Sequence, residues 1–329
     1  MDTEAKFQLV SSEMQFEPAE ETPLTGQSPS TPGPCGVSPA DWQKLTRGQK
    51  VFAPIHMAAM PGGKRLPMLK TMLTTACERD CFYCPFRAGR SSMRRATLKP
   101  DEMAKTFVEL NKSGVAQGIF LSSGIIKGGA STQDKLIDTI EILRRKHNYA
   151  GYVHLKIMPG AEKDQVFRAM QLADRISVNL EAPNENRLPA LAPHKIFFDE
   201  LLQRLQWADE IRRTQSPHQG WHGKWPSLVT QFVVGAAGES DMEILSTTGY
   251  LMKQLRLARA FAARQDAMLL DEPFGALDAI SRAEAHEAFE RVRRDVRFTA
   301  LLVTHDLAEA ARLPDTIVVM RAGRVEQAG

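Results

Sequence analysis

Three cysteines stand close together in the sequence and have the spacing of a metal-cluster site. Cys77, Cys81 and Cys84 form a Cys-x3-Cys-x2-Cys run. A [4Fe–4S] cluster normally takes four thiolates, so three thiolates leave one iron open to a ligand that is not protein. The run therefore predicts an iron–sulfur cluster with one reactive iron.

Zinc binding and disulfide bonds are the alternatives for these cysteines. A structural zinc site usually combines two Cys-x2-Cys pairs, and no second pair follows Cys84. The chain has four cysteines, no secretory segment and no apolar run near the roughly 20 residues of a membrane span. We therefore expect a reduced, cytoplasmic protein without membrane insertion. Cys35, in a Pro-rich stretch, is expected to lie outside the site.

The chain around the cysteines alternates between apolar runs and amphipathic stretches. This alternation predicts an α/β fold, in which helices such as 100–113 and 132–146 lie between parallel strands. The expected strands are 68–75, 118–123, 152–158, 175–181 and 228–235. Right-handed crossovers would curl them into a partial (β/α)6 barrel. The cysteines follow the first strand at its carboxyl end, where α/β folds place their sites.

Polar residues also occur within and after the other expected strands. Ser177, Asn179 and Glu181 alternate along the fourth strand and would share one face, which fits either a bound ligand or an exposed sheet edge. His154 and Lys156 alternate in the same way along the third strand. They could contact a substrate or form a satisfied interior pair.

Composition divides the chain into regions. Its 43% hydrophobic content can supply a sizeable core. Residues 1–45 are rich in Pro, Ser, Thr and Glu, which predicts a disordered tail. Basic residues predominate from 42 to 100 and could bind nucleic acid or a phosphorylated small molecule, or form an ordinary solvated face. They include Lys64, Arg65, Lys70, Arg87, Arg90, Arg94, Arg95 and Lys99.

The cysteine loop resembles the radical S-adenosylmethionine superfamily. Together with Pro-Gly-Gly-Lys-Arg-Leu-Pro at 61–67 and Asn-Leu-Glu-Ala-Pro at 179–183, it is similar to the branch associated with DNA modification or repair and with uracil-DNA glycosylase. The resemblance covers about residues 50–257, within an expected core domain of residues 46–257. It implies a [4Fe–4S] cluster on the three cysteines and S-adenosyl-L-methionine on the open iron.

The same resemblance implies an activity and its partners. One electron from an external flavodoxin- or ferredoxin-like donor would cleave the sulfonium to a 5′-deoxyadenosyl radical, and nucleic acid is a candidate substrate. No catalytic side chain is assigned. The implied cosubstrate contacts are Tyr83, Ser122, Ser123, Gly124, Ser177, Asn179, Glu181, Gly235 and Glu239. The superfamily often has Gly-Gly-Glu where this chain has Ser-Ser-Gly at 122–124, so the close backbone approach is kept and the carboxylate is lost.

After Leu257 the sequence instead resembles the last part of an ABC-importer ATPase. The implied vestigial ATPase residues are Asp271 and Glu272 of the Walker B strand, Asp278 of the D-loop and the switch His305. The chain has no G-x-x-x-x-G-K-[ST] phosphate loop and no Leu-Ser-Gly-Gly-Gln signature. We therefore expect neither ATPase activity nor a transporter partner from this truncated 258–329 segment. The alternatives are the ATP-binding subunit of an importer and a non-functional chimera.

The join between the two resemblances affects the expected barrel. A helix is expected to run on through Ala262, so the sixth strand would be missing. Our hypothesis is that the Walker B strand, residues 267–271, takes that place beside the fifth strand. Beyond it we expect a helix near 282–295 and strands near 300–304 and 316–320, all poorly packed.

Overall fold

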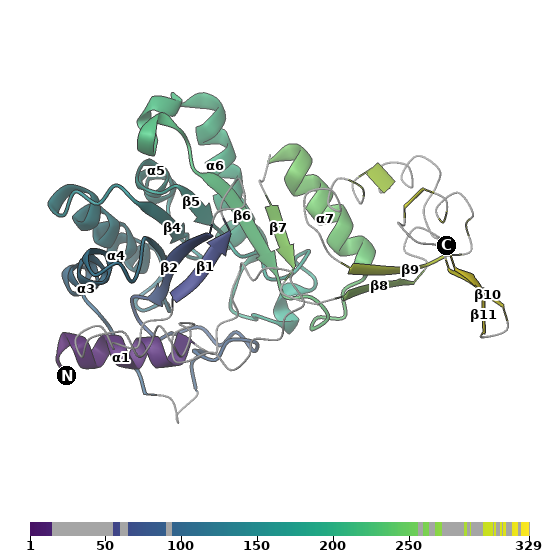
Figure 1. Cartoon of the computed structure of the whole chain (residues 1–329), viewed down its shortest axis with the longest axis horizontal. Coiled ribbons are helices and arrows are strands. Elements are labelled where there is room, and N and C mark those ends of the chain that lie inside the picture. The colour runs from purple at the N-terminus through teal and green to yellow at the C-terminus, as the bar shows by residue number, and fades with distance from the viewer. Residues whose placement is uncertain are drawn as a thin grey trace.

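A seven-stranded sheet forms the centre of the protein (Figure 1). The computed structural model describes residues 1–14, 55–59, 65–89 and 94–255. It also describes the short stretches 259–262, 267–271, 286–287, 290, 299–304, 306, 310, 312–313, 318–321 and 324–328. The sheet follows chain order: β1 (Ile55–Ala59), β2 (Arg65–Met72), β3 (Gly118–Ser122), β4 (Tyr152–Lys156), β5 (Arg175–Ser177), β6 (Ser227–Phe232) and β7 (Arg259–Ala262). From β2 to β7 all pairs are parallel, and β1 adds an antiparallel edge.

Helices connect the parallel strands and cover one face of the sheet. They are α3 (Pro100–Lys112), α4 (Gly129–Glu141) with a π-helical turn at Ile142–Lys146, α5 (Lys163–Leu172), α6 (Gln203–Thr214) and α7 (Asp241–Gln254). One face of the strands buries apolar side chains such as Leu69, Ile119 and Val153 in the same core as Phe107 and Leu136 of the helices. The partial (β/α)6 barrel expected from the alternation is confirmed, because each strand has a helix to bury its outer face.

The opposite, inner face of the sheet is partly polar. Strand pairing aligns Lys70 of β2 with Phe120 of β3, and Phe120 with His154 of β4. Side chains alternate between the two faces of a strand. The inner face therefore receives charged and aromatic residues from the positions between the apolar ones.

The first residues of the chain form a helix, contrary to the prediction of a disordered tail. Helix α1 (Thr3–Glu13) begins at the N-cap Asp2. Phe7, Val10 and Met14 are buried in the main core, and Lys6 pairs with Glu102 at 2.8 Å. Burial of these three apolar side chains, which stand at helical spacing, stabilises the helix although the average composition of the segment is polar. Residues 15–45 of the predicted tail lie outside the described part of the chain.

The sixth parallel strand is β7, so two expectations about the join are wrong. Residues 259–262 pair with Val229–Phe232 of β6 as a strand instead of continuing a helix. The Walker B segment is β8 (Ala267–Asp271), which pairs with β9 (Thr299–Val303) in a separate sheet. Figure 1 shows this pair on the far side of α7 from β6. The four residues of β7, which lies between α7 and β8 in the sequence, pair with the open edge of β6, so β8 does not occupy that position.

Strands β10 (Val318–Arg321) and β11 (Arg324–Ala328) form an antiparallel pair near the expected strand at 316–320, and β9 matches the one expected at 300–304. Most of the helix expected near 282–295 lies outside the described residues. Within the described ranges, no helix is long and apolar enough to cross a membrane.

Candidate functional site

The cysteine loop begins just beyond the carboxyl end of β2. Leu73 N donates to Ser122 O at 2.9 Å, and Gly124 N donates to Thr74 O at 2.8 Å, so β2 and β3 stay together past their last strand residues. Cys77 Sγ accepts hydrogen bonds from Arg79 N and Ile125 N, each at 3.4 Å. These two hydrogen bonds fix the position of the Cys77 sulfur beside the end of β3.

The other two cysteines follow in a tight turn. Cys84 N donates to Cys81 O at 3.0 Å. Burial raises the pKa of the Cys81 thiol, and the Lys195 ammonium opposes this rise. Within the described ranges, no three or more His, Cys, Asp and Glu side chains gather as a single metal ion requires. A [4Fe–4S] cluster has a different requirement, because each of its thiolates binds a different iron.

A buried ion pair lies beside the loop. Lys195 Nζ donates to Glu181 Oε1 at 2.8 Å and to the Tyr83 hydroxyl at 3.2 Å. Burial alone would raise the pKa of Glu181, but the ammonium groups of Lys195 and Lys156 outweigh it and lower that pKa. For Lys195, burial would lower the pKa, and Glu181 with Cys81 reverses the effect and raises it. A carboxylate and an ammonium group are thus both held charged next to the thiols.

Several buried polar atoms near the strand ends have no hydrogen-bond partner among the described residues. They are Ser123 Oγ, Ser177 Oγ, Asn179 Oδ1 and Glu181 Oε2. Buried polar groups are nearly always paired, so a set of four near one edge of a sheet indicates a polar ligand. S-adenosylmethionine, with its ammonium, carboxylate and ribose hydroxyl groups, offers donors and acceptors for such atoms.

Gly124 has a steric role beside the cysteine loop. A Cβ atom at this position would lie 2.2 Å from Ala76 O and 3.2 Å from Cys77 Cβ. Glycine therefore lets the end of β3 touch the loop. Ser122 and Ser123 precede it and are buried.

The Gly-rich turn after β6 is closed by its own carboxylate. Glu239 accepts from the backbone N–H groups of Gly235 and Ala237, the latter at 3.0 Å. Gly235 has a φ of 83°, which favours glycine. Glu239 thus shapes the turn, and its contact with the cosubstrate stays a prediction.

The predicted alternation along the fourth strand is only partly right. β5 ends at Ser177, and Glu181 has a φ of 67°, outside strand geometry. The segment nevertheless follows β6, since Val178 N donates to Val229 O at 3.1 Å and Glu181 N to Gln231 O at 3.0 Å. Asn179 Nδ2 donates to Gln231 Oε1 at 3.3 Å. Ser177 and Glu181 are buried, so they do not form an exposed edge.

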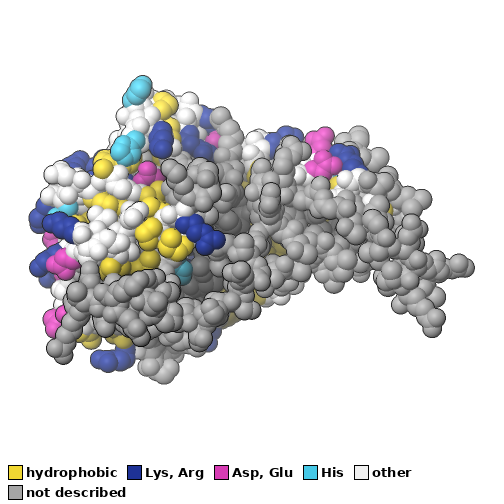
Figure 2. Space-filling view, viewed as in Figure 1, with side chains coloured by type: hydrophobic (Ala, Val, Ile, Leu, Met, Phe, Trp, Pro, Cys, Tyr) yellow, Lys and Arg dark blue, Asp and Glu magenta, His cyan; other side chains and the backbone are white. Residues whose placement is uncertain are grey.

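The basic residues between 42 and 100 do not form one surface. Lys70 is buried on the inner face of the sheet. Arg95 donates to the carbonyls of Phe86 and Arg87, both at 3.0 Å, and so holds the end of the cysteine loop. On the face in Figure 2, Lys and Arg side chains are scattered among Asp and Glu. Lys64 and Arg90 lie outside the described residues.

Sequence reasoning missed the segment that packs against the cysteine loop. Phe82 N donates to Leu191 O at 2.8 Å. Arg79 pairs with Glu200 at 2.6 Å, and His194 Nδ1 lies 2.7 Å from Asp80 Oδ1. These contacts join positions more than 100 residues apart, and no spacing in the sequence signals them.

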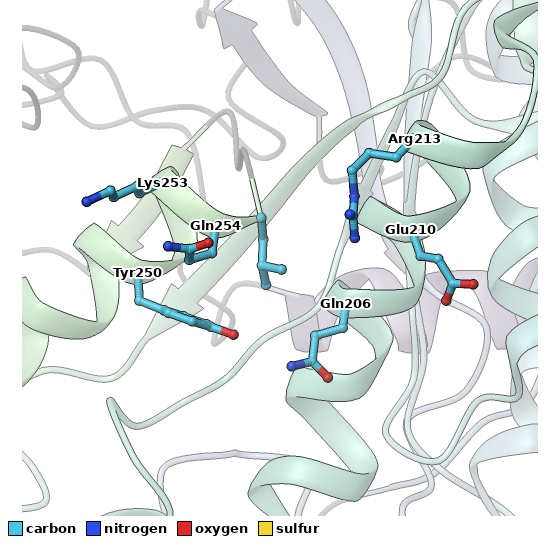
Figure 3. A pocket seen from close by; sticks show the side chains of 7 residues that line it. Gln206, Glu210, Arg213, Tyr250, Lys253 and Gln254 are labelled. Carbon is cyan, nitrogen blue, oxygen red and sulfur yellow. The ribbon is translucent and has the colours of Figure 1, made fainter.

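Two other regions stand apart from this site. An open hollow of about 660 Å³ lies between α6 and α7, and none of the predicted site residues lines it (Figure 3). Of the vestigial ATPase residues, the backbone of Asp271 ends β8. The Asp271 side chain and Glu272, Asp278 and His305 lie outside the described part of the chain.

Comparison with known proteins gives two separate similarities. Residues 71–251, more than half of the chain, match the family model described as Radical SAM superfamily. The FeFe-hydrogenase maturase HydG from Carboxydothermus hydrogenoformans is similar in structure at 15% identity, with a TM-score of 0.48, over 73% of this chain and 54% of that chain.

The curated relatives match a shorter length. The aliphatic sulfonates import ATP-binding protein SsuB of Burkholderia thailandensis is 53% identical over 78 residues, 24% of this chain and 23% of the relative. SsuB of Burkholderia pseudomallei is 50% identical over 78 residues, 24% of each chain. The chain thus spans about a quarter of the length of these relatives.

Proposed function

Because the chain belongs to the Radical SAM superfamily, we propose that it is an enzyme whose Cys77, Cys81 and Cys84 hold a [4Fe–4S] cluster with one iron open to S-adenosylmethionine. When bound, the cluster and cosubstrate supply a one-electron cleavage of the sulfonium that yields a 5′-deoxyadenosyl radical. One observation carries the proposal. The three thiols share a loop at the carboxyl end of β2, next to buried polar atoms that have no partner among the described residues.

The residues around the thiols have distinct roles in this proposal. The N–H groups of Arg79 and Ile125 donate to Cys77 Sγ and fix its position. Lys195 places a positive charge near Cys81 and Cys84, which offsets the negative charge of the thiolates. Ser177 and Asn179 offer polar atoms to the cosubstrate.

The electron must come from an external one-electron donor, which we propose to be a flavodoxin- or ferredoxin-like protein. A nucleic-acid substrate stays a prediction from the sequence. That prediction used the basic residues between 42 and 100. Lys70 among them is buried and Arg95 is bound to backbone carbonyls, so these two do not contribute to a continuous nucleic-acid surface.

Anaerobic reconstitution with iron and sulfide tests the cluster. We expect the broad visible absorption of an iron–sulfur protein in the wild type and its loss in Cys81→Ser. Cys35→Ser is the matched control and should keep the absorption. Reduction in the presence of S-adenosylmethionine should then release 5′-deoxyadenosine. A wild type that takes up no iron, or a Cys81→Ser variant that takes up as much as the wild type, would contradict the proposal.

The similarity to SsuB supports a second, weaker candidate, an ATP-binding segment. The sequence lacks the phosphate loop that holds the β- and γ-phosphates, so we propose no ATP turnover. Mg²⁺-dependent ATP hydrolysis that is lost in Glu272→Gln would overturn this. A cluster without any 5′-deoxyadenosine release would instead favour the non-functional chimera.

A further inference from the structure

Reciprocal hydrogen bonds join the cysteine loop to the turn that follows β3. Glu78 N donates to Ile125 O at 2.8 Å, and Ile125 N donates to Cys77 Sγ at 3.4 Å. The Glu78 carboxylate accepts two more hydrogen bonds, from Lys127 N at 3.0 Å and from Gly128 N at 3.1 Å. Each of its two oxygens takes one of these N–H groups. Glu78 therefore contacts three residues of the 125–128 turn through both its backbone and its side chain.

The backbone of this turn is shaped to bind a carboxylate. Lys127 has a φ of 59° and Gly128 a φ of 89°. Successive N–H groups in such a turn converge on one point and form a concavity that binds an anion. The left-handed region is unfavourable for a side chain such as that of Lys127, and the hydrogen bonds to Glu78 help to offset this cost.

The same carboxylate lies at the start of α4. Gly128 is the N-cap of this helix, and no side chain of the N-cap residue accepts a hydrogen bond there. The N-terminus of a helix favours a negative charge. Glu78 supplies that charge from the cysteine loop, so the loop and the helix hold each other in place.

The residues just before the turn belong to the proposed site. Ser123 has a buried Oγ without a hydrogen-bond partner within the described residues. Gly124 follows it, and its N–H donates to Thr74 O at 2.8 Å, three residues before Cys77. The position of the turn therefore affects the distance between Ser123 and the Cys77 sulfur.

We propose that Glu78 is a positioning residue of the cluster site. By holding the 125–128 turn, its carboxylate fixes Cys77 against the end of β3 and at a set distance from Ser123, a proposed cosubstrate contact. Its use in a radical reaction rests on the proposed function, whereas the contact with the turn needs no cluster. The Glu78 residue is exposed, so its replacement should leave the core intact.

Hydrogen exchange of the full-length protein without a cluster, measured by NMR, tests the contact. The amides of Lys127 and Gly128 should exchange about fivefold faster in Glu78→Gln than in the wild type, which corresponds to the roughly 1 kcal/mol of a helix cap. Glutamine has the length of glutamate but cannot present an oxygen to each N–H group. Asp80→Asn removes the same charge from the same loop, at the pair with His194. It is the matched control and should leave both amides unchanged.

The reconstituted protein tests the positioning role. Replacing a residue that orients a metal ligand typically costs about tenfold or more in affinity or activity. Glu78→Gln should still take up iron, since all three cysteines remain. The electron paramagnetic resonance spectrum of its reduced cluster should respond to S-adenosylmethionine only at about tenfold higher concentration than in the wild type. Asp80→Asn should respond at the wild-type concentration.

The outcomes separate this inference from the proposed function. Equal exchange of both amides in the wild type, Glu78→Gln and Glu78→Ala would overturn the proposal. Faster exchange with an unchanged response to S-adenosylmethionine would overturn the positioning role, because a merely structural contact would give that result. A wild type that takes up no iron would contradict the proposed function, and the exchange of the two amides would still decide whether Glu78 holds the turn.

Discussion

The ammonium group of Lys195 lies 2.8 Å from the carboxylate of Glu181, and the two side chains are only 8% and 4% exposed. Glu181 belongs to the segment beyond β5, and Lys195 also donates to Tyr83 of the cysteine loop. The pair therefore connects the proposed cluster ligands to the proposed cosubstrate site.

Removing one partner of this pair should destabilise the protein strongly. Lys195→Met would leave the Glu181 carboxylate buried without its counter-charge, and we expect a loss of about 3–5 kcal/mol in the free energy of unfolding. Urea unfolding measures it. The double variant Lys195→Met/Glu181→Gln should recover part of the loss. Lys163→Met breaks the half-exposed pair with Glu210 and should lose no more than about 1 kcal/mol; an equal loss in both single variants would contradict the argument.

Gly124→Ala should displace the cysteine loop. The new Cβ would need the space of the Ala76 carbonyl, 2.2 Å away, and the hydrogen bonds from Gly124 N to Thr74 O and from Glu78 N to Ile125 O hold the two backbones together. We expect iron uptake on reconstitution to fall severalfold. Gly114→Ala has a strained φ of 78° but no atom within 4 Å of the added Cβ. It should lower stability by about 1 kcal/mol and leave iron uptake unchanged.

Stability should decrease below pH 6.5 because of His56. Burial of the imidazole, and then the charge of Lys70, lower the pKa of His56 to about 4. A histidine in the unfolded chain has a pKa of about 6.5. Between these values the unfolded chain binds a proton that the folded protein does not, so stability falls as the pH is lowered.

The expected loss between pH 6.5 and 4 is about 2–3 kcal/mol. Urea unfolding at a series of pH values measures it. His56→Gln should flatten the dependence, and His218→Gln, at an exposed position, should not. The same slope in the wild type and His56→Gln would show that other groups cause it.

The stability of the first turn of α7 should depend on the carboxylate of Glu243. Its carboxylate accepts from Arg187 Nε at 3.0 Å and from Ser240 N at 2.8 Å, and these hydrogen bonds lower the pKa of Glu243 to about 2. Glu243→Gln should lower stability by about 1 kcal/mol, since solvent screens a partly exposed pair. The contribution should be lost in the wild type as the pH falls from about 4.3 toward 2. Hydrogen exchange of α7 is the measurement, with exposed Glu185→Gln as the control; equal protection in both variants would exclude this role.

The sequence predicted most elements because their signals are local. The apolar runs that became β2 to β6 and the amphipathic stretches that became α3 and α4 each bury one face, and periodicity reports burial. The strand ends were less accurate: the strand expected to reach Glu181 stops at Ser177. The segment 259–262 could not be recognised as a strand, because Arg-Ala-Phe-Ala has no strong preference and only the open edge of β6 makes it one.

By itself, the sequence determined the chemistry-bearing triplet Cys77, Cys81 and Cys84 and the parallel strand order that places it at a carboxyl edge. Spacing and periodicity are properties of neighbouring residues, so they can be read without a fold. Only the tertiary structure decided that Lys195 reaches Glu181 and Tyr83, and that Lys70, His154 and Arg175 share one face. Those relationships depend on strand register and on loops that return over long separations, which packing of the whole core fixes and no local pattern records.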